Sequence, residues 1–114
     1  MLNHIDFFQT RLEVRLDSDQ TVMRVRALNG ILECLNALPT GDHVYFVISY
    51  KNRQEVVRYD HTQPLTLQGS SILLPIERGQ HGTVITSWAA GICVRTELTK
   101  AILDEWWREK DCNC

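Results

Sequence analysis

Two neighbouring segments, at residues 43–50 and 54–61, predict the clearest hairpin of the chain and constrain its fold more than any other feature. If Asn52-Arg53 forms the loop between them, four pairs of residues face each other: Tyr50 with Glu55, Ile48 with Val57, Phe46 with Tyr59, and Val44 with His61. This register gathers most of the apolar side chains on one face, and such a face fixes the register of a half-buried sheet. We therefore expect an antiparallel hairpin whose second face is mixed in character.

The mixed face of this hairpin supplies the candidate ligand-binding residues. It carries His43, Tyr45, Arg58 and Asp60, and the expected register sets Tyr45 directly opposite Asp60. Acid–base chemistry or the binding of a small polar ligand requires such side chains to be held in a pocket. The default interpretation is a solvated sheet face with incidental cross-strand pairs. A pocket beside the 43–61 hairpin is the alternative.

The remaining segments predict one more strand, a long helix and a second hairpin. Residues 11–17 alternate between apolar and charged side chains, which is typical of a half-buried strand. Residues 20–38 carry leucines and an isoleucine at spacings of three and four, which predicts an amphipathic helix capped by Ser18 or Asp19. Residues 71–77 and 83–88 predict a second hairpin through the turn 79–82, and Pro75 favours a sheet edge for its first strand.

A final helix is expected from Thr96 to about Lys110, and its apolar arc is unusually wide. Trp106 falls on the same side as the other apolar residues of this helix, whereas Leu103 and Trp107 lie further round. Two interpretations carry nearly equal weight. Either both indoles are buried against the sheet, or Leu103 and Trp107 form an exposed strip for dimerisation or for a partner protein.

These elements predict an α+β fold for a single domain over residues 1–114. The expected architecture is a mostly antiparallel sheet of about five strands, with a long helix in the N-terminal half and a C-terminal helix packed on one face. The chain shows no internal repeat and no linker-like stretch. Residues 111–114 are expected to be a frayed tail.

Several functional classes find no support in the sequence. The 12 basic and 14 acidic residues are spread along the chain, so no basic cluster indicates nucleic-acid binding. No apolar stretch approaches the length of a membrane span. The only short pair of metal-ligating residues is Cys112 and Cys114, and nothing near it in sequence completes a site, so we expect neither metal nor cofactor. Without a signal peptide, reduced thiols in a cytoplasmic protein are the better interpretation of the four cysteines.

The sequence contains no recognisable catalytic motif, so function is inferred largely from what is missing. The first hypothesis is a non-enzymatic protein-interaction module, either a homodimer or an accessory or inhibitor protein, with Leu103 and Trp107 at the interface. The second hypothesis is a small-ligand-binding domain or minor enzyme that uses the pocket beside the 43–61 hairpin.

Overall fold

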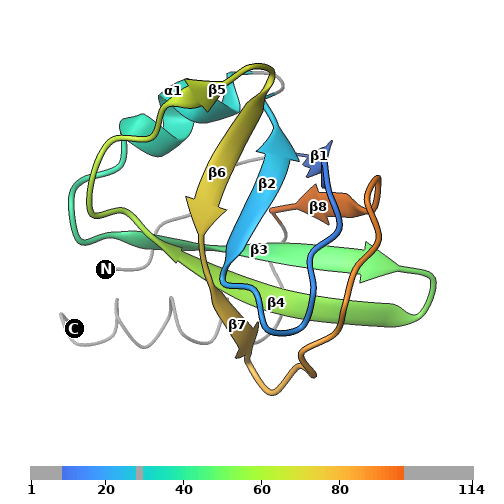
Figure 1. The fold of residues 1–114 in the computed structure, drawn as a ribbon. Coiled ribbons are helices and arrows are strands. Elements are labelled where there is room, and N and C mark those ends of the chain that lie inside the picture. The colour runs from blue at the N-terminus through green and yellow to red at the C-terminus, as the bar shows by residue number, and fades with distance from the viewer. Residues whose placement is uncertain (1–8, 28–29, 97–114) are drawn as a thin grey trace, which may run out of the picture.

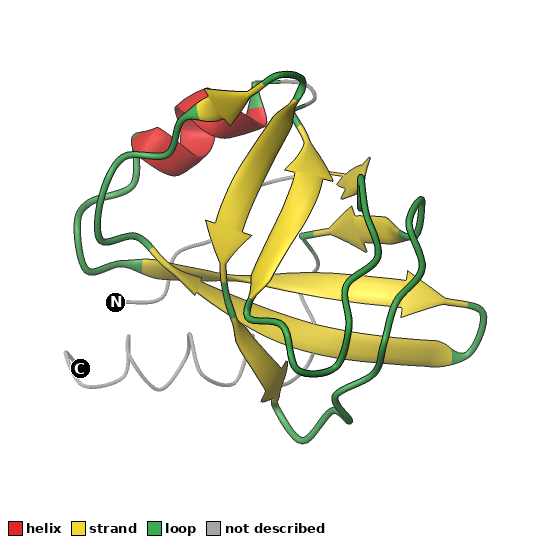
Figure 2. Ribbon diagram, in the orientation of Figure 1, coloured by secondary structure: helices red, strands yellow, loops and turns green. Residues whose placement is uncertain are grey.

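The chain folds into two antiparallel β-sheets with one short helix, as seen in a computed structural model that describes residues 9–27 and 30–96. Strands account for 48% of these residues and helix for only 7%. Figure 2 shows the helix of residues 31–36 at one corner of the described strands and loops. The predicted α+β class is therefore wrong for the described part of the chain, which is mostly β. The predicted C-terminal helix lies outside the described residues.

The larger sheet has five strands in the order β1-β8-β3-β4-β7, and all of its neighbouring strands run antiparallel. Its strands are β1 (Gln9–Arg11), β8 (Cys93–Arg95), β3 (His43–Tyr50), β4 (Arg53–Asp60) and β7 (Glu77–Gln80). Because β1 pairs with β8, segments more than 80 residues apart in the sequence lie side by side in this sheet.

The smaller sheet has three strands in the order β2-β6-β5, and Figure 1 shows it crossing the β3–β4 hairpin at a steep angle. Its strands are β2 (Val22–Arg26), β6 (Ser71–Pro75) and β5 (Leu67–Gln68). Two connections join the sheets. Leu12 bridges Val25 on one side, and on the other β6 continues into β7 through Ile76, whose N–H donates to the Thr21 carbonyl at 2.8 Å. The sheets therefore wrap around one interior.

That interior is filled by inward-facing side chains from both sheets and from the helix α1 (Ile31–Asn36). The largest fully buried members are Trp88, Tyr59 and Phe46. Burying a large apolar side chain contributes roughly 1.5–3 kcal/mol, so each of these residues stabilises the shared core of the two sheets.

The predicted β3–β4 hairpin is confirmed, but its register is shifted by two residues. Tyr50 pairs with Arg53, and the turn falls on Lys51-Asn52, with Lys51 at a φ of 56°. A shift by two preserves which side chains share a face, because strand side chains alternate with a period of two. The apolar face is therefore as expected, whereas the facing pairs differ: Phe46 lies opposite Val57 instead of Tyr59.

The long helix predicted over residues 20–38 is wrong, because strand β2 occupies its first part. Met23 and Val25 point inward while Arg24 and Arg26 point outward, which is the two-residue period of a strand. The helical pattern holds only over Ile31–Asn36, and Gly30 precedes this helix with a φ of 74°. Residues 20–38 therefore combine a strand period at Val22–Arg26 with a helical period at Ile31–Asn36.

Two further predictions fail in part. Of the strand expected over residues 11–17, only Arg11 lies in a regular strand, at the end of β1, while Leu12 and Leu16 form isolated bridges and Val14 is exposed. The second hairpin is absent from the described residues: β6 pairs with β2 and β5, and residues 83–88 form no ladder with it. Pro75 ends β6 instead of marking an edge strand, because β6 is the central strand of its sheet.

Candidate functional site

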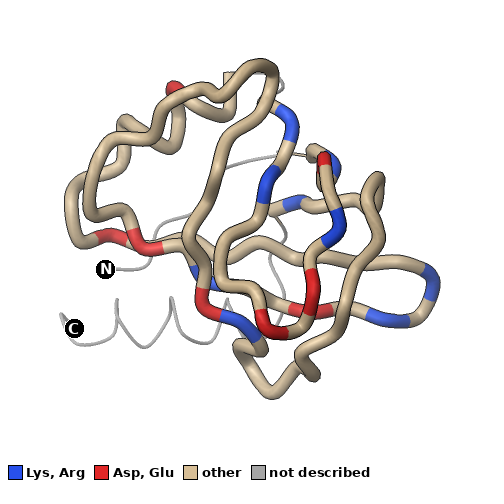
Figure 3. Tube along the Cα trace, viewed as in Figure 1, with Lys and Arg blue, Asp and Glu red and all other residues tan. Residues whose placement is uncertain are grey.

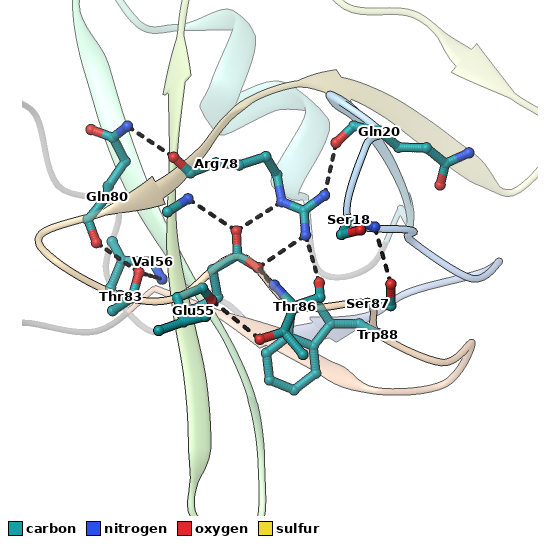
Figure 4. Close-up of polar contacts among 12 residues, drawn as sticks. Ser18, Gln20, Glu55, Val56, Arg78, Gln80, Thr83, Thr86, Ser87 and Trp88 are labelled. Carbon is teal, nitrogen blue, oxygen red and sulfur yellow. Dashed lines mark hydrogen bonds and ion pairs between the residues drawn. The ribbon is translucent and has the colours of Figure 1, made fainter.

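The most concentrated polar arrangement in the described residues surrounds the Glu55 carboxylate, which is fully buried under β7 and the loop that follows it. Five N–H donors converge on its two oxygens, as Figure 4 shows. Oε2 accepts from Arg78 Nε at 2.7 Å and from the Gly79 N–H at 3.0 Å. Oε1 accepts from Arg78 Nη2 at 3.0 Å, the Thr86 N–H at 3.1 Å and Trp88 Nε1 at 3.0 Å.

These donors keep Glu55 ionised inside the protein. Burial is the largest single influence on this carboxyl group and opposes its ionisation, but the hydrogen bonds from Arg78, Trp88, Thr86 and Gly79 together outweigh it. The pKa of Glu55 therefore lies below its ordinary value. A carboxylate saturated by five internal donors has no lone pair left for a substrate, so it serves the structure and is unsuited to acid–base catalysis.

The Arg78 side chain, which is only 4% exposed, ties three segments of chain together. Besides its paired bonds to Glu55, it donates from Nη1 to the carbonyls of Asp17 at 2.7 Å and Gln20 at 2.8 Å. It also donates from Nη2 to the Thr86 carbonyl at 2.6 Å. The buried ion pair therefore fixes the 17–20 segment and the 81–87 loop against the β4–β7 pair.

The 81–87 loop is anchored at both of its ends. At the start, Thr83 Oγ1 donates to the Gln80 carbonyl at 2.7 Å and accepts from the Val56 N–H at 3.0 Å. At the end, Thr86 is held by the Glu55–Arg78 pair, and the next residue, Ser87, accepts from the Ser18 N–H at 3.1 Å. Between these anchors lie Val84 and Ile85.

Val84 and Ile85 are large apolar residues whose side chains are exposed to solvent: Val84 is 75% exposed and Ile85 is 46% exposed. Ile85 also packs close to the backbone of Gly79, because a Cβ placed at Gly79 would lie 2.8 Å from Ile85 Cγ1. The loop therefore presents two aliphatic side chains from a backbone that hydrogen bonds hold in one conformation.

The residues predicted as ligand-binding do lie together on the outer face of β3 and β4. His43 pairs across the strands with Asp60, and Tyr45 pairs with Arg58. The predicted pairing of Tyr45 with Asp60 is wrong because of the two-residue register shift. Arg58 and Asp60 form a half-exposed ion pair at 2.8 Å, which raises the pKa of Arg58.

The default interpretation of this face as solvated is also wrong. His43, Tyr45, Val47 and Val56 are all buried. The Tyr45 ring lies 4.3 Å from the ring of His81, and it meets the His43 ring edge-on at 5.4 Å, both measured between centroids. The outer face of this hairpin is therefore a second, smaller apolar cluster rather than an open polar surface.

Two small clefts lie beside the hairpin and share Asp60, Thr62 and Pro75 in their linings. One measures about 210 Å³ and adds Arg58 and Glu77, and the other measures about 190 Å³. Neither is lined by Tyr45 or His43. Sites for drug-sized ligands usually exceed about 300 Å³, so these clefts suit at most a very small ligand.

Some candidate residues cannot be placed. Leu103 and Trp107, predicted at an interface, lie outside the described residues, as do Cys112 and Cys114. Within residues 9–27 and 30–96, no three His, Cys, Asp or Glu side chains come together as a metal site. No helix in the same ranges has both the length and the apolar character to cross a membrane.

Sequence reasoning missed the Glu55–Arg78 pair, although one signal was available. Glu55 occupies an apolar-face position of the hairpin, and a carboxylate at such a position must be paired when it is buried. The identity of its partner was not readable, because Arg78 lies 23 residues away and reaches Glu55 only through the β4–β7 pairing.

Comparison with known proteins adds no assignment: no family model, curated protein or solved structure matches this chain.

Proposed function

We propose that this chain is a protein-interaction module whose contact element is the 81–87 loop. The observation that carries the proposal is the exposure of Val84 and Ile85 on a loop with hydrogen-bonded anchors on both sides. Contiguous exposed apolar patches mark protein-interaction sites, and Val84 and Ile85 are adjacent on this loop. A loop already fixed in one conformation loses little entropy when it binds.

The internal use of the strongest polar groups supports the same proposal. Glu55 and Arg78 form their hydrogen bonds within the protein, including bonds to the 17–20 and 81–87 segments. Such bonds hold a binding loop in a fixed position on a rigid scaffold. The two clefts near Asp60 are small, and the buried Tyr45 and His43 line neither. Small-ligand binding therefore has weaker support than protein contact.

Photo-crosslinking from position 84 tests this proposal. A benzophenone amino acid replaces Val84 in the cells that make the protein, and the mass of each adduct is measured after irradiation. We expect one discrete adduct, whose mass distinguishes a second copy of the chain from another protein.

Matched variants decide whether such an adduct reflects a specific contact. Ile85→Asp should abolish it, whereas Leu67→Asp should not, because Leu67 is equally apolar and 53% exposed but lies on β5. An adduct that survives Ile85→Asp, or the absence of any adduct, would contradict the proposal.

A further inference from the structure

The exposed part of the 81–87 loop offers backbone groups as well as side chains to a partner. Residues 83–87 contain no helix, strand, turn or bend, so the backbone continues in one general direction. Among the residues that the structure describes, none hydrogen-bonds to the N–H of Val84 or of Ile85. A segment of this kind can pair with an extended backbone of another protein, as an edge strand does.

Hydrogen bonds hold the chain immediately before and after these two residues. On the N-terminal side, the Thr83 hydroxyl donates to the Gln80 carbonyl at 2.7 Å. On the C-terminal side, the Thr86 N–H donates to Glu55 at 3.1 Å, and the Thr86 carbonyl accepts from Arg78 at 2.6 Å. Figure 4 shows that both sets of bonds come from the same buried scaffold. The two ends of the exposed segment are therefore fixed relative to each other.

The peptide bond between Val84 and Ile85 lies at the centre of this arrangement. Ile85 packs against Gly79, where an added Cβ would lie 2.8 Å from Ile85 Cγ1. Val84 projects further and is 75% exposed. The Thr86 hydroxyl donates to the Val84 carbonyl at 3.2 Å, a long bond that stronger donors of a partner could replace. A small aliphatic side chain thus stands free on the N-terminal side of a firmly held peptide bond.

The loop and the chain that follows it carry no charge. No lysine, arginine, aspartate or glutamate occurs between Arg78 and Arg95, and Figure 3 shows this stretch without charged positions. Removing a charge from water is costly, whereas burying an aliphatic side chain is favourable. The partner that fits this loop therefore has an apolar pocket in a cleft that binds an extended backbone.

We propose that the 81–87 loop inhibits a serine endopeptidase by occupying its substrate cleft. This inference rests on the proposed interaction function and names the class of its partner. The side chain before the scissile bond enters the pocket that sets the specificity of such an enzyme, and elastase has a small pocket there. Val84 is the side chain for that pocket, and a loop already fixed in one conformation loses little entropy on binding.

The anchors on both sides make this loop a poor substrate. When the enzyme's serine oxygen attacks the Val84 carbonyl carbon, the C–N bond breaks and the catalytic histidine gives a proton to the Ile85 nitrogen, leaving Val84 as an ester. Packing on Gly79 and the Thr86 bonds hold the new amine beside that ester. Groups held in this way react at effective concentrations of about 10⁵–10⁸ M, so the amine re-forms the peptide bond before water hydrolyses the ester.

Inhibition of purified pancreatic elastase, measured with a chromogenic peptide substrate, tests this inference. We expect an inhibition constant below about 1 μM, as for other protease–inhibitor complexes, and inhibition that persists on long incubation. Val84→Asp should weaken inhibition about 100-fold, as expected for a residue at the centre of an interface. Leu67→Asp is the matched control on β5 and should change inhibition less than about twofold.

Two further variants guard against effects of misfolding. Val84→Arg should transfer inhibition from elastase to trypsin, whose pocket carries an aspartate, and a misfolded protein would not gain this activity. Thr83→Val keeps the shape of the side chain but removes its bonds to Gln80 and Val56. Elastase should therefore cleave this variant after residue 84 about tenfold faster than the unsubstituted protein.

Three results would each overturn the inference: no inhibition of elastase at micromolar concentrations, complete cleavage of the unsubstituted chain within minutes, or failure of Val84→Arg to inhibit trypsin. Photo-crosslinking from position 84 reports separately on the proposed function. A discrete adduct with a protein other than an endopeptidase, together with no inhibition of elastase, would reject the endopeptidase as partner and retain the loop as a contact element.

Discussion

Replacing Glu55 by glutamine should destabilise the protein severely while changing its shape very little. The substitution leaves the Arg78 guanidinium, only 4% exposed, without its counter-charge. It also turns an amide NH₂ toward N–H donors that a carboxylate oxygen now accepts. Removing one partner of a buried ion pair costs about 3–5 kcal/mol. At roughly 4 °C per kcal/mol for a domain of this size, Tm should fall by about 12–20 °C.

Urea unfolding followed by tryptophan fluorescence measures this loss, and a double-mutant cycle locates its origin. Arg78→Met should also destabilise strongly, and the double variant Glu55→Gln/Arg78→Met should cost less than the two single variants added together. The half-exposed Arg58–Asp60 pair is the control, because Asp60→Asn should cost less than about 1 kcal/mol. A cost below about 1 kcal/mol for Glu55→Gln would refute the reasoning that this pair holds the loop.

Three further predictions concern titration and backbone strain. Because the folded pKa of Glu55 is lowered, its contribution to stability is present above the unfolded pKa of about 4.3 and is lost as pH falls through the folded pKa. Below that unfolded pKa, the free energy of unfolding should therefore fall less steeply with decreasing pH for Glu55→Gln than for the unsubstituted protein. Burial raises the pKa of Tyr59 to about 12, so stability should decline as pH rises from about 10 toward 12, and Tyr59→Phe should remove that decline in alkaline unfolding experiments. Gly79→Ala should cost more than Gly82→Ala in urea unfolding: both glycines have positive φ, which costs an alanine about 1–2 kcal/mol, but only Gly79 also places a Cβ against Ile85.

The part of the fold that could be predicted is the part where two strand-forming runs flank a short turn. The β3–β4 hairpin follows from such runs, and even its wrong register kept Phe46 and Val57 on the buried face. The failure over residues 20–38 has a physical cause. Val22–Arg26 satisfies both a strand period and the start of a helical one over so short a window, and the pairing of Met23 with Leu74 decides between them. Such pairing is non-local and leaves no mark within the segment itself.

In the candidate sites, too, features set by the local sequence could be predicted, whereas features set by distant contacts could not. The grouping of Arg58 with Asp60 followed from their shared face, whereas the burial of Tyr45 did not, because contacts such as that with His81 come from elsewhere in the chain.

The pairing of β1 with β8 has a consequence for how this protein is made. Thr10 leaves the ribosome long before its partner Val94, so the body described here cannot close until nearly the whole segment to Arg95 has emerged. Until then, β3 lacks its neighbour β8, and the edge of an apolar-faced hairpin stands open to other chains. Folding governed by such distant pairing is slow compared with that of helical domains. Chaperone binding and aggregation during synthesis should therefore depend on how soon β8 emerges and pairs with β1 and β3.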